Sequence, residues 1–175
     1  MQIVHNLKSI PKRHVDDPEF RSLMMTKRLG ALAGSKRLYV NIDSVKPGGK
    51  SVKYHSHSLQ EEFFLILKGT GTLRLQGRLI PVKVGDFFAK PCGRGISHQF
   101  LNDGREVLEI LDCGTNDRND IVKYPDEGVL LLKDSRIAKK GSKIVANWTP
   151  DPNEENPPNN RFSRAREGVP RAVRR

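Results

Sequence analysis

Short strand-like segments separated by turn residues fill the chain from residue 38 to residue 113. Apolar and polar residues alternate in RLYVNIDSV and in TLRLQ, and the stretch EEFFLILKG is apolar over most of its length and ends at a glycine. Glycine, proline, asparagine and aspartate recur between these segments about every ten residues, a spacing typical of antiparallel sandwiches and barrels. No stretch of this region keeps a helical apolar period over several turns. The pattern therefore predicts an all-β fold, an antiparallel sandwich or a small antiparallel β-barrel.

The two ends of the chain differ from this middle region. The sequence DDPEFRSLMMTKRL predicts a helix near the N-terminus, because Asp17 can cap it and Pro18 suits its first turn. Near the other end, the stretch 149–160 holds four prolines and four asparagines but no aliphatic or aromatic residue. Such a stretch cannot bury a core of its own, so we expect a linker or an arm against a partner, with Trp148 as its anchor.

The net charge of +11 lies in the same two ends. Residues 1–50 and 136–175 each carry ten basic and four acidic side chains, whereas residues 51–135 carry eleven and twelve. A basic excess can attract nucleic acid. The C-terminal sequence RFSRAREGVPRAVRR has a single aromatic residue and no nucleic-acid motif, so we interpret it as a solvated tail. We therefore predict an N-terminal arm (1–28), a barrel (29–135) and a basic Pro/Asn-rich C-terminal tail (136–175).

Length and composition favour one domain in a reducing compartment. A chain of 175 residues can form a single domain with a real core. No apolar run approaches the ~20 residues of a membrane span, and the N-terminal sequence lacks the apolar core of a secretory signal. Cys92 and Cys113 are too few for a disulfide framework, so we expect buried reduced thiols. These features predict a cytoplasmic protein with no membrane contact.

Two histidines, His55 and His57, come just before the apolar run that begins at Phe63. Residues i and i+2 of a strand point to the same face, so the two imidazoles should lie side by side. Neutral imidazole is the commonest metal ligand, and two at this spacing can grip one ion. By itself the pair is weak evidence, because histidines of this spacing are common on solvated strands.

A carboxylate and a third imidazole strengthen the hypothesis of a metal site. Glu61 and Glu62 are adjacent on the next strand and face opposite ways, so one of them can share the face of the histidines. His98 lies in a separate strand signal, GISHQFLN, which a closed barrel can bring beside the first. Three imidazoles and one carboxylate suit a divalent transition metal and leave up to two octahedral positions open for a ligand.

These stretches resemble the two motifs of the cupin superfamily. The first motif is matched in spacing by Gly49, His55, His57, Glu62 and Gly69, and this match selects Glu62 rather than Glu61 as the ligand. The second motif is matched by Gly85, Pro91, Gly93, His98 and Asn102. This chain has four residues, RGIS, between Gly93 and His98 where the motif usually has two, so the loop that leads to the histidine departs from the pattern.

The resemblance extends from about residue 29 to residue 133, where the chain is similar to uncharacterised bacterial single-domain cupins of the conserved-barrel type. It implies a jelly-roll barrel, a homodimer, and one divalent metal ion (Fe, Mn, Ni or Zn) held by His55, His57, Glu62 and His98. It also implies a metal-dependent enzyme acting on a small polar organic substrate, and dioxygenase, isomerase, decarboxylase and lyase chemistry all stay open. The alternative is a non-catalytic binding or sensor protein with the same metal site.

The alternation of the strands also predicts a pocket. Phe64 and Ile66 share the parity of Glu62, and Phe100 shares the parity of His98, so we expect these three apolar side chains to line the cavity. On parity alone the pocket is mostly apolar. A charged acid or base within it would favour the enzyme over the binding protein.

Overall fold

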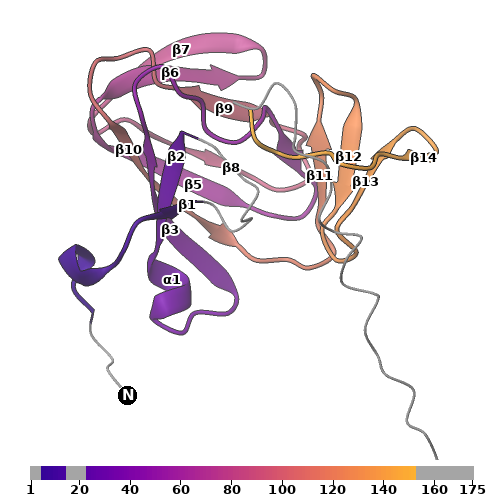
Figure 1. The fold of residues 1–175 in the computed structure, drawn as a ribbon, viewed down its shortest axis with the longest axis horizontal. Coiled ribbons are helices and arrows are strands. Elements are labelled where there is room, and N and C mark those ends of the chain that lie inside the picture. The colour runs from indigo at the N-terminus through magenta and orange to yellow at the C-terminus, as the bar shows by residue number, and fades with distance from the viewer. Residues whose placement is uncertain (1–4, 15–22, 153–175) are drawn as a thin grey trace, which may run out of the picture.

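The computed structural model describes residues 5–14 and 23–152, and nearly all of their regular structure is β-strand (Figure 1). The strands form three antiparallel sheets. Within the described residues the helical elements are a 3₁₀ turn at Leu7–Ser9 and the short helix α1 at Leu29–Leu32. No helix in this part of the chain is long and apolar enough to cross a membrane.

The largest sheet has six strands in the order β1 (Arg13–His14), β2 (Met24–Arg28), β3 (Leu38–Val45), β10 (Leu108–Thr115), β5 (Glu62–Lys68) and β8 (Phe87–Lys90). A three-stranded sheet has the order β7 (Arg78–Lys83), β6 (Thr70–Leu75) and β9 (His98–Leu101). The remaining sheet has the order β14 (Lys143–Ile144), β13 (Ile137–Lys140), β12 (Val129–Leu132), β11 (Ile121–Tyr124) and β4 (Ser56–His57).

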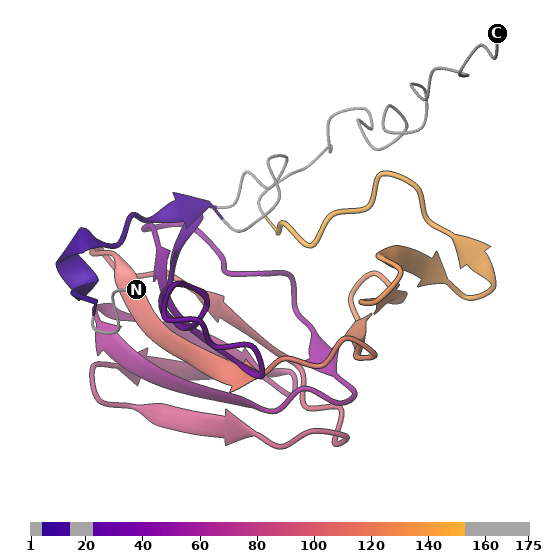
Figure 2. The ribbon, with the colours of Figure 1, turned by 90° about the horizontal axis from the view of Figure 1, so that it is seen from below.

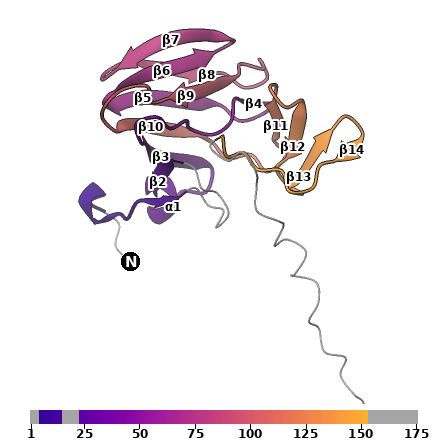
Figure 3. The same ribbon diagram turned by 45° about the horizontal axis from the view of Figure 1, so that its top comes forward.

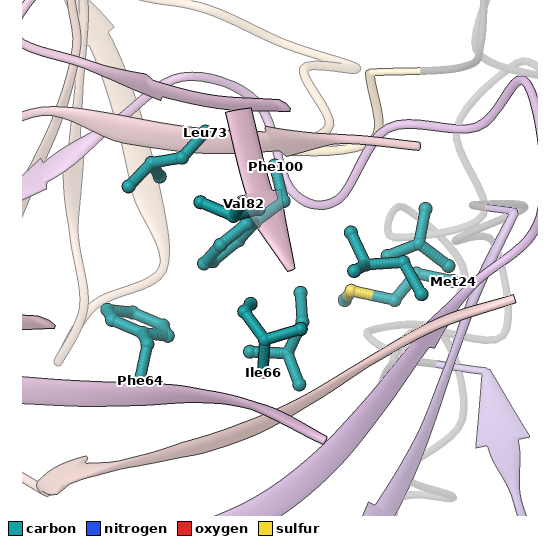
Figure 4. Packing of buried hydrophobic residues seen from close by; sticks show 9 residues of the cluster. Met24, Phe64, Ile66, Leu73, Val82 and Phe100 are labelled. Atoms are coloured by element: carbon teal, nitrogen blue, oxygen red, sulfur yellow. The ribbon is translucent and has the colours of Figure 1, made fainter. Parts of the chain in front are cut away.

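The main core lies between the six-stranded and the three-stranded sheets, which face each other as two layers (Figure 3). Side chains from both layers meet there (Figure 4). The cluster consists of Met24, Val45, Phe64, Ile66, Leu73, Val82, Phe100, Leu108 and Ile110. Burial of this much apolar surface is the main force that holds the two layers together.

A second, smaller core lies under the third sheet, which projects to one side of the barrel (Figure 2). It contains Val122, Tyr124, Val129 and Ala138, with Trp148 packed against them at a ring distance of 4.5 Å from Tyr124. The strands β13 and β14 belong to this sheet and lie in the segment that the sequence assigns to the tail. Regular structure therefore continues past residue 135, and Trp148 packs this segment against the third sheet.

Three expectations need correction. Met24–Arg28 is strand β2 and not part of a helix, because its buried residues alternate with a period of two and the segment pairs with β3. The start of the expected helix, including Asp17 and Pro18, lies outside the described residues. Cys92 is exposed, since it lies in the turn that follows β8, and Cys113 is half-buried. Both cysteines are free, as expected.

The alternation predicted for β5 is confirmed. Glu62, Phe64 and Ile66 are buried, whereas Phe63 and Leu67 on the opposite face are exposed. One face of β5 therefore turns toward the interior of the barrel, with Glu62 at its start.

Candidate metal centre

The backbone brings the three predicted histidines together at one end of the barrel. His55 and His98 form an antiparallel bridge, in which each backbone N–H donates to the carbonyl of the other at 3.1 and 2.9 Å. His57 lies in β4 opposite Val122. The ring centroid of His55 is 4.9 Å from that of His57 and 4.7 Å from that of His98.

Glu62 joins this cluster from the first position of β5. Its side chain is buried, whereas Glu61 is exposed. Ligand atoms of His55, Glu62 and His98 all lie within 4.8 Å of one another, and Oε1 of Glu62 lies 3.4 Å from Nε2 of His57. The structure thus gathers the four side chains, and His55, Glu62 and His98 form a possible metal site.

Two of the imidazoles are oriented by acceptors outside the cluster. Nδ1 of His55 lies 2.7 Å from the carbonyl oxygen of Lys53, and Nδ1 of His57 lies 2.5 Å from Oδ2 of Asp120. A carbonyl or a carboxylate can only accept, so each Nδ1 carries a proton, and in a neutral imidazole this leaves the lone pair on Nε2. Metal-binding histidines use this same arrangement, in which the far nitrogen donates to an oxygen.

Asp120 is a site residue that the motif did not include. It is 1 % exposed, and its Oδ1 accepts hydrogen bonds from the backbone N–H groups of Ser58 and Leu59 and from the Ser58 hydroxyl. Burial alone would raise its pKa, but the hydrogen bonds from His57, Leu59 and Ser58 hold the pKa well below its usual value. Asp120 therefore stays ionised and fixes the orientation of His57.

Lys90 is the second residue that the motif did not include. It lies opposite Glu62 across the β5–β8 pair and is 3 % exposed. Its ammonium forms an ion pair with Oε2 of Glu62 and lies 2.7 Å from Nδ1 of His98. Burial lowers the pKa of Lys90, although the charge of Glu62 opposes this effect. An internal cation therefore already contacts two of the four predicted ligands.

The other oxygen of Glu62 is also held. Oε1 accepts from the Tyr39 hydroxyl at 3.0 Å and from the Gln60 amide at 3.1 Å. Burial would raise the pKa of Glu62, but its electrostatic interactions with His98, His57 and Lys90 outweigh this effect and lower the pKa. Glu62 is thus an ionised carboxylate in a fixed orientation.

Two of the histidines, His55 and His98, are neutral because they are buried. Burial lowers the pKa of His55 to about 3, and electrostatic interactions with His57 and Lys90 act in the same direction. Burial also lowers the pKa of His98 well below its usual value. Neutral imidazoles are the form that binds a metal ion, so the chemistry of this donor set fits a divalent transition metal.

A cavity of about 490 Å³ opens from this cluster, a size typical of small-ligand sites. Phe64 and Phe100 line it as the alternation indicated, whereas Ile66 belongs to the core and borders a separate hollow. The wall is less apolar than expected. Its charged side chains beyond Glu62 are Arg28, Asp43, Asp112 and Lys133.

Sequence reasoning missed the polar lining because it lies on strands that also carry regular apolar positions. Tyr39, Asn41 and Asp43 alternate along β3, and all three line the cavity. The sequence LYVNIDSV shows this alternation, but a strand face on which every second residue is polar normally faces solvent. Asp120 follows a run of polar loop residues and carried no comparable signal.

Comparison with known proteins agrees with this geometry. Residues 41–114 match the cupin domain family, a region that contains all four predicted ligands. The chain thus contains a cupin domain, and its antiparallel sheets form the jelly-roll barrel of that fold.

Two solved structures are similar over most of their length. One is a sugar phosphate isomerase candidate from Acidithiobacillus ferrooxidans, with 25% identity, a TM-score of 0.70, and coverage of 84% of this chain and 97% of that chain. The other is a sugar phosphate isomerase of the cupin superfamily from Silicibacter pomeroyi, with 26% identity, a TM-score of 0.66, and coverage of 80% and 88%.

A curated relative is similar over a shorter segment. An oxalate-binding protein from Thermotoga maritima is 37% identical over 65 residues, which cover 37% of this chain. The match spans 52% of that relative, and a second curated relative is spanned over 58% of its length. The chain thus spans a little over half the length of each of these curated relatives.

Proposed function

We propose that this protein is a metal-dependent cupin enzyme that acts on a small polar organic substrate. His55, His57, Glu62 and His98 would hold one divalent transition metal. The observation that carries the proposal is the shared cavity, in which ionisable side chains line the same space as the imidazole cluster. An apolar pocket would suit simple binding, whereas acids and bases beside a Lewis acid site suit proton transfer.

When bound, the metal would supply a Lewis acid that polarises a carbonyl or carboxylate of the substrate. The chain's own residues have separate tasks. Asp120 and the Lys53 carbonyl hold the two imidazoles of the first motif in their binding tautomer. Tyr39 and Gln60 hold the carboxylate of Glu62. Phe64 and Phe100 exclude water from one wall of the cavity.

Among the reactions that the cupin resemblance leaves open, isomerisation has the most support. The two similar structures are a sugar phosphate isomerase and a candidate for one. Arg28 and Lys133 line the cavity and supply positive charge for an anionic group of the substrate. We therefore infer a hydroxylated carbonyl compound that carries an anionic group.

The alternative function is a binding or sensor protein whose metal orients a ligand without turnover. The oxalate-binding relative favours it, since it is 37% identical to this chain over 65 residues. The acids and bases of the cavity wall distinguish the two functions. Binding alone needs side chains of complementary charge, whereas catalysis also needs a proton donor. The alternative remains an outcome of the test below.

The test is to incubate metal-reconstituted protein with small hydroxy-carbonyl phosphates and with dicarboxylates, and to follow both by NMR. An enzyme consumes at least one compound, and Glu62→Ala abolishes the consumption. Saturable binding of a compound without any change to it would establish the alternative.

We also infer a homodimer formed through the outer face of the six-stranded sheet. Phe63 and Phe87 stack there at a ring distance of 5.9 Å while 36 % and 69 % exposed. An exposed aromatic pair on a sheet face fits a protein contact. Light scattering at micromolar concentration checks this, and a monomeric mass would contradict it.

A further inference from the structure

Two carboxyl groups face each other in the wall of the cavity. Asp43 lies on β3 opposite Ile110, and Asp112 lies on β10 opposite Asn41, so the two aspartates are diagonal neighbours on one face of the sheet. Burial raises the pKa of both carboxyl groups, that of Asp43 to about 6, and the charge of Asp43 raises the pKa of Asp112 further. Two carboxyl groups placed side by side share one proton more readily than they carry two negative charges. The pair therefore contains one acid and one base.

Hydroxyl groups on both sides hold the pair in place. The Thr26 hydroxyl donates to Oδ1 of Asp43 at 2.5 Å, and the Tyr39 hydroxyl lies 2.9 Å from Oδ1 of Asp112. Tyr39 also lies 3.0 Å from Oε1 of Glu62, so a single side chain links the pair to the imidazole cluster. A positioned acid and base thus lie within one residue of the candidate metal ligands, and both line the same cavity.

We propose that Asp43 and Asp112 are the catalytic acid and base for 1,2-isomerisation of the phosphate ester of a small hydroxy aldehyde or hydroxy ketone. This inference rests on the proposed function and adds the residues and the step. Arg28 and Lys133, which line the same cavity, supply the charge that such a phosphate needs.

The step balances with the single proton of the pair. The ionised carboxylate removes the proton from the hydroxyl-bearing carbon beside the carbonyl, and that electron pair forms the C=C bond of an enediol. The carbonyl π electrons move to the carbonyl oxygen, which takes the proton of the other carboxyl group. In the second half, the hydroxyl on the first carbon loses its proton to the pair, and the former carbonyl carbon gains one. The carbonyl moves by one carbon, and the pair ends with one proton.

The experiment measures exchange with solvent in D₂O. Metal-reconstituted wild type, Asp43→Asn and Asp112→Asn are incubated with dihydroxyacetone phosphate, ribulose 5-phosphate and fructose 6-phosphate. The control is Asp103→Asn, an exposed aspartate that also accepts from a threonine hydroxyl. We expect wild type and the control to incorporate deuterium beside the carbonyl of at least one compound. Each cavity variant should be at least ~100-fold slower at unchanged metal content, the range lost with a general acid or base.

A second readout needs no substrate. The infrared carbonyl band of a buried protonated carboxyl group should be present in the metal-free wild type at pH 7.5 and lost in Asp112→Asn, because burial holds the pKa of Asp112 well above its usual value. A wild type without this band overturns the inference, because the pair then holds no proton.

Other outcomes separate this inference from the proposed function. Metal-loaded wild type that incorporates no deuterium into any of the three compounds, or that isomerises one without incorporation, overturns the inference alone. The same holds if either cavity variant is as fast as wild type. A wild type that takes up no divalent metal overturns the proposed function instead.

Discussion

Asp120 controls the orientation of His57 because its two carboxylate oxygens accept hydrogen bonds from different partners. Oδ2 accepts from the imidazole, and Oδ1 accepts from the Ser58 and Leu59 backbone and from the Ser58 hydroxyl. Both oxygens are therefore committed, and the loop that follows the first histidine pair is tied to the loop that precedes β11. This carboxylate acts on the candidate metal centre without belonging to it.

Asp120→Asn should weaken metal binding by ~10–100-fold, the cost usually seen when such a partner is lost. Both oxygens of Asp120 accept hydrogen bonds, whereas an asparagine side chain has one oxygen that accepts and one NH₂ group that donates. In either orientation, the NH₂ group would face an N–H donor, that of His57 or those of the Ser58–Leu59 backbone. The measurement is a competition titration against a chromophoric chelator. Asp117→Asn in the same loop is the control, because Asp117 accepts only a local backbone hydrogen bond that is exposed. Equal affinities for the two variants would show that Asp120 has no role in the metal site.

Lys90→Met should strengthen metal binding by at least ~10-fold. The ammonium contacts Glu62 and His98, and two unit charges about 4 Å apart repel each other by roughly 4 kcal/mol at an effective dielectric of 20. Methionine keeps the length of the side chain and removes this repulsion. The same competition titration measures the effect, with exposed Lys83→Met as the control. Weaker binding by Lys90→Met would mean that the lysine supports the site.

The strands β3 and β10 show why the site was only partly predictable from the sequence. On β5 the buried parity is apolar apart from Glu62, so the alternation identified its inner face correctly. On β3 the cavity-lining residues Tyr39, Asn41 and Asp43 carry the polar parity, which is typical of a solvated face. The rule that polar residues face outward fails where the barrel interior holds a polar cavity. Motif spacing selected the histidines and Glu62, but it carries no information on Asp112, which the pairing of β10 with β5 and β3 brings near them.

Gly114 on β10 positions Tyr39 and Glu62 by leaving room for them. It pairs with Glu62 of β5, and a Cβ at this position would clash with the Glu61 carbonyl oxygen and lie 2.8 Å from the Tyr39 ring and hydroxyl. We expect Gly114→Ala to lower the free energy of unfolding by about 3 kcal/mol, because neither backbone nor ring can yield easily.

The control for this variant is Gly77→Ala. Gly77 has open space around it but a φ of 75°, so the backbone alone should cost about 1 kcal/mol. Urea unfolding of both variants checks the order. If Gly77→Ala is the less stable of the two, backbone conformation rather than crowding governs these positions.

At the scale of the whole molecule, the barrel was predictable and its extension was not. Regular alternation and turn residues identified the all-β core because two-layer packing needs both. The segment 136–152 lacks such regularity, yet it adds β13 and β14 and places Trp148 on Tyr124. Long-range contacts of this kind depend on which surface is available for packing, and local pattern does not encode that.

Stability should depend on pH through the carboxyl pair of the cavity. Burial raises the pKa of Asp43 from 3.8 to about 6, and hydrogen bonds from Thr26 and Asp112 oppose this only in part. The folded protein therefore binds a proton between these two pH values that the unfolded chain has released. The stabilisation is fully present below about pH 4 and is lost as pH rises through 6.

Asp43→Asn removes this titration while it keeps an acceptor for Thr26. Relative to wild type, the variant should gain roughly 2–3 kcal/mol in free energy of unfolding between pH 4 and pH 7.5, from about 1.4 kcal/mol per unit of pKa. Urea unfolding of both metal-free proteins at several pH values measures the difference. His55 and His98 change the pH dependence of the free energy of unfolding in the opposite direction, because their pKa values are lowered. Both proteins contain these histidines, so their contribution cancels in the comparison. A difference that stays constant with pH would refute the assignment.

The central claim is that His55, His57, Glu62 and His98 hold one divalent metal ion, and elemental analysis of untagged protein tests it most directly. The protein should be prepared without chelator, with His57→Ala and Glu62→Ala alongside, and anomalous diffraction should locate any ion found. We expect close to one transition-metal ion per chain at these four side chains in wild type, and a large loss in both variants. A wild type that contains no metal and takes up none of the added divalent ions would contradict it.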